Sequence, residues 1–245
     1  MSTAIDTNPS GYRRSSIDPH DNAGLVLLLG AIVAFWLLAI VVLGMAGVFE
    51  AGPGRPPLPL LVALVTPPAL FLIAYRVSTA FRGFVLGLDL RMLTAMQTWR
   101  VLGGMFLFLY AFDLRPALFA FPAGIGDVAV GVAAVFVLRA MLDDHPHWRR
   151  RVLLLNLGGL LDFVGAIATG VLTSNSAIGL FAPATPMPSM GLMPLSLIPT
   201  FAVPLWIIIH FASLLQLRQG RNYPRANTAR SAPANEPSSR YLMPK

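Results

Sequence analysis

The sequence predicts an all-α protein, a polytopic transmembrane helical bundle with six crossings and one short interfacial helix. Three observations favour this class. The chain contains six long apolar segments with few charged residues. Runs such as Leu25–Leu29 do not alternate between apolar and polar residues, as the strands of a membrane barrel do. Once the six segments are taken as crossings, all but two of the 18 Lys and Arg residues fall on one side.

The apolar segments follow one another from the N-terminal region to the C-terminal region. A helix needs about 20 mainly apolar residues to cross a hydrocarbon layer of ~30 Å, which five segments provide easily and the third does not. The first has an apolar core too long for a cleaved signal, so we expect it to remain as a crossing. The approximate bounds are Gly24–Phe49, Pro57–Tyr75, Thr98–Leu114, Pro122–Leu142, Val152–Thr173 and Leu192–Leu217.

The basic residues predict the orientation of the bundle. With the N-terminus inside, only Arg55 and Arg115 lie outside, and cytoplasmic loops carry the excess of Lys and Arg in membrane proteins. We therefore expect both termini in the cytoplasm and basic rims that face anionic lipid head groups. The net charge of +7 then requires no nucleic acid. The preference for Arg over Lys is typical of a GC-rich bacterial genome, which predicts the bacterial cytoplasmic (inner) membrane.

Outside the six segments the chain is mostly polar. Residues 1–22 and 218–245 predict disordered cytoplasmic tails around a single transmembrane domain, 23–217. Between the second and third segments, apolar residues recur at helical spacing over 81–96, which predicts the short helix in the inner interface. Residues 174–191 carry no charge and several prolines. We expect this outer loop to touch the membrane or to cap the bundle.

Two carboxylates lie at membrane depth, where ionisable residues are costly and mark functional candidates. Asp162 lies near the midplane, ~16 Å of helix from either end of its segment, and Asp127 lies closer to the outer side. Small residues four positions apart let a neighbouring helix approach each of them. These are Gly158, Ala166 and Gly170 around Asp162, and Ala123 and Gly131 around Asp127. We expect the fourth segment beside Asp162, with the sixth segment and His210 as the alternative.

Three more polar residues predict an inner layer below Asp162. His210 lies in the sixth segment, Asn156 lies at similar depth in the fifth, and Arg100 lies at the start of the third. A histidine titrates near neutral pH and suits a proton relay, whereas the alternative for His210 is one interhelical hydrogen bond. The alternative for Arg100 is a side chain that snorkels to the inner head groups.

These residues favour a small bundle that moves or binds a small solute or proton, as a transporter or permease does. Asp162, Asp127, His210, Arg100 and Asn156 are its binding or proton-path candidates. The alternative is a non-catalytic scaffold or assembly subunit, which packs through small-residue stripes against its own copies or a partner membrane subunit.

An intramembrane enzyme is the least expected class, because the crossings contain no nucleophile–base pair and no set of metal ligands. The chain has no cysteine, which excludes disulfides and thiolate metal sites. His210 is the single histidine of the crossings, so a haem held by two histidines would lack a ligand. We therefore expect no cofactor and no metal. The ligand-rich turn 143–147 predicts an ordinary loop between two crossings.

Overall fold

The structure is a computed structural model that describes residues 19–52, 54–184 and 187–219. Over these residues the all-α prediction is confirmed, because the regular elements there are all helices. The predicted tails lie mostly outside this part of the chain. The helices are α1 (Pro19–Met45), α2 (Leu58–Val77), α3 (Thr79–Gly87), α4 (Leu90–Met96), the 3₁₀ helix η1 (Gln97–Gly104), α5 (Met105–Ala111), α6 (Ala117–Leu142), α7 (Trp148–Leu172), the π-helical turn η2 (Ile198–Ala202) and α8 (Val203–Arg218).

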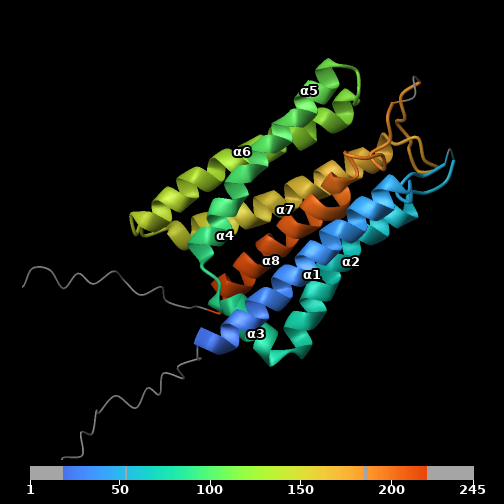
Figure 1. The fold of residues 1–245 in the computed structure, drawn as a ribbon. Coiled ribbons are helices and arrows are strands. Elements are labelled where there is room, and N and C mark those ends of the chain that lie inside the picture. The colour runs from blue at the N-terminus through green and yellow to red at the C-terminus, as the bar shows by residue number, and fades with distance from the viewer. Residues whose placement is uncertain (1–18, 53, 185–186, 220–245) are drawn as a thin grey trace, which may run out of the picture.

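The long helices run roughly along one axis and give the bundle two distinct ends (Figure 1). The connections α1–α2, α5–α6 and α7–α8 lie together at one end, and their residues line a common cavity. We call this the cavity end. The other end holds the α2–α3 and α6–α7 connections and the last turn of α8. It carries Arg76, Arg82, Arg91, Arg139, Arg149, Arg150, Arg151 and Arg218, and we call it the basic end.

Five helices of the described chain are long and apolar enough to cross a membrane: α1, α2, α6, α7 and the continuous η2–α8. Their outward faces expose large apolar side chains, such as Leu27 at 73%, Phe35 at 73% and Leu161 at 71%. Contiguous apolar surface of this extent is unusual for a protein in water and suits contact with lipid.

The third apolar segment forms η1 and α5, and together with the preceding α4 these run side by side with α6 (Figure 1). The contact is close because α6 presents small residues to it. A Cβ atom placed on Gly131 would lie 2.7 Å from the backbone nitrogen of Val101 and 3.1 Å from the carbonyl oxygen of Thr98. A sixth crossing stays a prediction, since none of the three pieces is long enough alone.

Two capped helices replace the one interfacial helix expected over 81–96. The Ser78 hydroxyl accepts a hydrogen bond from the Phe81 backbone N–H at the start of α3, at 3.2 Å. The Asp89 carboxylate accepts one from the Arg91 backbone N–H at the start of α4, at 2.8 Å. Leu88 and Asp89 both have an extended backbone, so α3 ends at Gly87 and α4 begins at Leu90. The helix η1 then follows α4 directly.

The prediction that the small residues of α7 pack against a neighbouring helix is wrong at Gly158. This residue is exposed and has no atom within 4 Å of the position that a Cβ would take. The buried glycine is Gly159, about 100° further around the helix. Ala166 does pack against the apolar cluster around Phe106 and Phe119. The helix expected beside Asp162, α6, does lie there, at Gly126.

Gly131→Ala should lower the free energy of unfolding by about 1–3 kcal/mol, because the new methyl group meets backbone that cannot rotate away. Gly158→Ala is the matched control: its methyl group meets open space, and the better helix propensity of alanine should leave stability equal or slightly higher. Thermal unfolding of both purified variants in detergent measures the difference. Equal melting temperatures would contradict the close α6–η1 contact.

Candidate functional site

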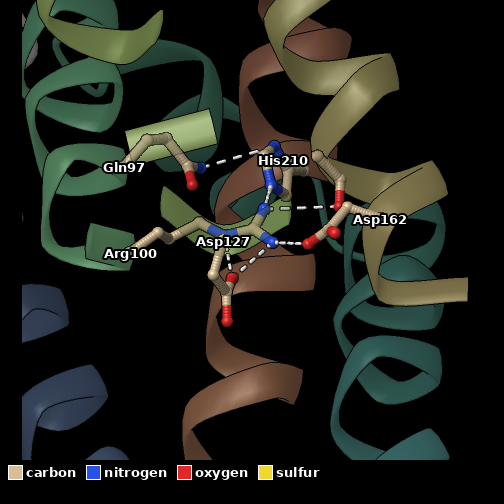
Figure 2. A network of polar contacts seen from close by, with 6 residues as sticks. Gln97, Arg100, Asp127, Asp162 and His210 are labelled. Carbon is tan, nitrogen blue, oxygen red and sulfur yellow. Dashed lines mark hydrogen bonds and ion pairs between the residues drawn. The ribbon is translucent and has the colours of Figure 1, made fainter. Parts of the chain in front are cut away.

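A buried arginine, Arg100, lies at the centre of a polar network inside the bundle (Figure 2). It belongs to η1 and is 3% exposed. A 3₁₀ helix has three residues per turn, so side chains three apart lie on one face. Gln97, Arg100 and Gly103 therefore face the same way, and all three contact the network.

Every nitrogen of the Arg100 guanidinium has a partner. Nε donates to Asp127 Oδ1 at 2.7 Å, and Nη2 lies 2.7 Å from the same oxygen. Nη2 also donates to Asp162 Oδ2. Nη1 donates to the Gly159 carbonyl at 3.3 Å and lies 3.2 Å from His210 Nε2. Figure 2 shows the guanidinium between the two carboxylates, which come from α6 and α7, with His210 of α8 beside it.

The alternative in which Arg100 snorkels to the inner head groups is wrong. The chain before Arg100 is already helical from Leu90, so the arginine starts no crossing and lies midway along the α4–η1–α5 run. Its charged end points into the bundle, where Phe163 covers one face of the guanidinium at 3.9 Å from the ring centre. Such a cation–π contact stabilises a desolvated arginine.

The donors and acceptors around His210 determine which of its nitrogens carries a proton. Arginine only donates, so Nε2 accepts from Arg100 and Nδ1 carries the hydrogen. Nδ1 then donates to the Asn156 side-chain oxygen at 2.8 Å. The Gln97 amide nitrogen also faces Nδ1, at 3.4 Å, while the Gln97 oxygen is buried without a partner. Turning the Gln97 amide over places its oxygen, an acceptor, toward the Nδ1–H, while the amide nitrogen takes the unpartnered position. The neutral ring then serves as a positioning group for Arg100.

Glycines create the space that the charged groups occupy. A Cβ on Gly126 would overlap the Asp162 carboxylate, and one on Gly103 would overlap the side chain of Asp127. On Gly159 it would overlap the His210 ring. A side chain at any of these three positions would force the network apart, so the close helix packing and the polar contacts depend on each other.

The charges of the network do not balance. One guanidinium faces two carboxylates, and no other ion pair in the described part of the chain involves Asp127 or Asp162. With both carboxylates ionised the network carries one excess negative charge, which is costly away from water. One proton or one bound cation removes the excess. The arrangement can therefore take up and release a single positive charge while Arg100 stays fixed.

A cavity of about 290 Å³ connects this network to the cavity end. Asp127 and Phe163 line its inner part, whereas the α7–α8 loop contributes residues such as Pro183 and Ser189 to its wall. The loop thus caps this end of the bundle. The Asp127 side chain is 17% exposed and that of Asp162 13%, against 1% for Arg100, and Asp162 does not line the cavity. Asp127 is therefore the charged member of the network that faces the cavity.

The structure brings all five candidates from the sequence, Asp162, Asp127, His210, Arg100 and Asn156, into one network. Sequence reasoning missed Gln97, Gly103, Gly159 and Phe163 as members. The three-residue spacing from Gln97 through Arg100 to Gly103 was the available signal for two of them.

Charge balance predicts strongly non-additive substitutions. Asp162→Asn or Asp127→Asn alone leaves a neutral pair with Arg100 and should reduce the free energy of unfolding by about 1 kcal/mol or less. The double variant leaves a buried, unpaired guanidinium and should lose about 3–5 kcal/mol. Denaturant unfolding in mixed micelles measures both, with Asp143→Asn, from the exposed Arg139–Asp143 pair, as the control. Additive losses would contradict the shared counter-charge.

Comparison with known proteins gives a family and no described function. Neither the curated proteins nor the solved structures give a match to this chain. One family model matches residues 57–218, which begin just before α2, end with α8 and include every member of the network. The chain belongs to this family, which is described as a domain of unknown function (DUF8737).

Proposed function

We propose that this protein is a multi-pass membrane carrier, in which movement of a small solute through the cavity is linked to one exchangeable proton. The observation that carries the proposal is the single Arg100 guanidinium shared by Asp127 and Asp162, with Asp127 facing a cavity. Intramembrane ionisable groups of this kind mark ion and substrate pathways. Arg100 is the fixed counter-charge in this mechanism, and His210, Asn156 and Gln97 hold it in place.

The linkage follows from competition for Arg100. When Asp127 takes a proton from the cavity, its attraction to the guanidinium weakens and Arg100 pairs with Asp162 alone. When the proton moves to Asp162, the pairing reverses. These two arrangements differ in which helix, α6 or α7, is tied to η1. A solute that binds one arrangement better shifts the population between them, which couples its movement to the proton.

The π-helical turn η2 provides a place where α8 can bend. It lies directly before α8, and Ile198, Pro199 and Val203 line the cavity. π-Helical turns within longer helices occur frequently at functional sites. Pro199 lacks an N–H, so the helix there is held by fewer hydrogen bonds. Bending at η2 changes the cavity wall without moving His210, which lies two turns further along.

For the membrane arrangement we propose six crossings in the bacterial inner membrane, with α4–η1–α5 as the third and both termini in the cytoplasm. Arg100 no longer counts as a loop charge, but the remaining arginines of the described chain still gather at the basic end, except Arg55 and Arg115. By the positive-inside rule, the basic end then faces the cytoplasm and the cavity end faces the outside.

The second candidate function is a scaffold or assembly subunit. It is favoured by the glycine contacts of α6, which hold η1 and α7 close in the manner of small-residue helix packing. In that case the Arg100 network is a permanent clasp, and no proton exchanges with the medium. The two functions therefore differ in one measurable property, the titration of the buried carboxyl groups.

Infrared difference spectroscopy of the protein in lipid vesicles should show one carboxylic acid band that appears on acidification between about pH 9 and 6, above the range in which exposed carboxyl groups take up protons. The band should be absent in Asp127→Asn and Asp162→Asn. An exposed carboxylate, Asp144→Asn, is the matched control and should leave the band unchanged. A band that both network variants retain, or a wild type without any such band, would leave the scaffold as the better account.

The absence of cysteine makes the orientation testable without background labelling. Ala177→Cys, in the exposed part of the α7–α8 loop, should react with a membrane-impermeant maleimide added to intact spheroplasts. Asp144→Cys, exposed at the basic end, should react only after lysis. Labelling of both variants in intact cells would contradict the proposed topology.

A further inference from the structure

Arg115, between α5 and α6, is a buried cation that the Arg100 network does not use. It lies in the wall of the cavity and is 6% exposed. Its Nη1 donates to the Pro188 carbonyl at 2.5 Å. Its Nε and Nη2 are buried and have no hydrogen-bond partner in the described part of the chain. Buried charges are normally paired, so these two donors lack the acceptor they require.

No carboxylate of the described chain compensates this charge. The ion pairs there involve Arg100 and Arg139, and Arg115 makes none. Burial lowers the pKa of the Arg115 guanidinium, and no neighbouring acid offsets the effect. A purely structural arginine would place its donors on backbone carbonyls or an acid, whereas Arg115 uses one nitrogen out of three in this way.

The free donors form a defined shape. In a guanidinium, the Nε–H and the Nη2–H lie on the same edge and point in parallel, which matches the two oxygens of one carboxylate. The third nitrogen, Nη1, is held by Pro188 on the other side. Because this is the one strong tie of the charged end, rotation about the side-chain bonds can turn the free edge into the cavity.

The rest of the cavity restricts what such an anion can carry. Its wall is mainly apolar, with Leu60, Leu64, Phe106, Phe119, Ile167 and Val171. At the inner part lies Asp127, ~15 Å further along α6 than the start of that helix. Asp127 repels a second acidic group, so a dicarboxylate or a polyphosphate is disfavoured there.

We propose that Arg115 is the anion-binding subsite of the cavity, and that the ligand is an organic monocarboxylate with an apolar body. The carboxylate pairs with the Nε and Nη2 edge, and the apolar body fills the space between Arg115 and Asp127. Binding of this ligand at Arg115 does not depend on the proposed carrier function. Its identity with the transported solute does.

The test uses the full chain, purified in a non-ionic detergent, with 4-phenylbutyrate as the probe and the uncharged 4-phenylbutyramide as its control. The acid should raise the melting temperature of the wild type in a saturable way, and the amide should not.

Arg115→Gln should weaken binding of the acid by about tenfold or more, since a charge-assisted bidentate pair is lost. Arg115→Lys keeps the positive charge but not the two parallel N–H donors, so its affinity for the acid should be intermediate. Arg55→Gln, an exposed arginine at the same end, should bind as the wild type does.

Stability without ligand separates a binding role from a structural one. Removing an unpaired buried cation should leave the melting temperature of Arg115→Gln equal to or above that of the wild type. If Arg115→Gln does not fold, the structural role is established and the proposal is overturned. Equal binding of acid and amide, unchanged binding in Arg115→Gln, or displacement of the probe by inorganic phosphate at similar concentration would also overturn it.

A second measurement avoids any change at Arg115. Ser189→Cys places a thiol in the cavity wall of an otherwise cysteine-free chain. The acid, and not the amide, should slow its reaction with a small maleimide, and equal rates would contradict the subsite. Asp127→Asn should still bind the acid. If the acid binds but the infrared titration of the carboxyl groups fails, only the carrier mechanism is contradicted. If the carboxyl groups titrate but the acid does not bind, only the Arg115 subsite is contradicted.

Discussion

The structure depends on one buried guanidinium that is shared by two carboxylates. Arg100 ties η1 to Asp127 of α6 and to Asp162 of α7, and its third nitrogen reaches α8 through His210. An unpaired charge at this depth costs several kcal/mol, so these four elements must keep the spacing that the ion pairs require. The helix packing is accordingly built around it: glycines lie wherever a side chain would displace a carboxylate or the imidazole.

The same constraint connects packing with function. A scaffold that needed only close helices could use the glycines without the charges, and apolar residues of similar volume often replace a buried ion pair at no loss of stability. Keeping three ionisable groups with unequal charge is explained more directly by a group that gains and loses a proton. The cavity reaches Asp127 while Arg100 is sealed, so the two groups have different access to the medium.

Much of this could be predicted from the sequence, because hydrophobic length and charge asymmetry depend on local composition. The five long helices and the candidates Asp127, Asp162, His210 and Asn156 follow from that information. The depth of Arg100 did not, since its apolar run begins late while the helix begins earlier, at Asp89 as N-cap. The four-residue spacing predicts Gly158 rather than Gly159 as the packed glycine, because such a pattern does not specify the rotation of a helix to within one residue, or about 100°. The burial of Arg115 depends on the α7–α8 loop, which comes from a distant part of the chain.

The central claim is that Asp127 and Asp162 together hold one exchangeable proton next to a permanently charged Arg100. Solid-state NMR of the protein in bilayers, with ¹³C-labelled aspartate carboxyl groups assigned by Asp127→Asn and Asp162→Asn, counts that proton directly. Our account predicts that the pair changes between one bound proton and none as the pH is raised, while the Arg100 side-chain nitrogens remain protonated. Two carboxylates that stay ionised together over the whole pH range would contradict it.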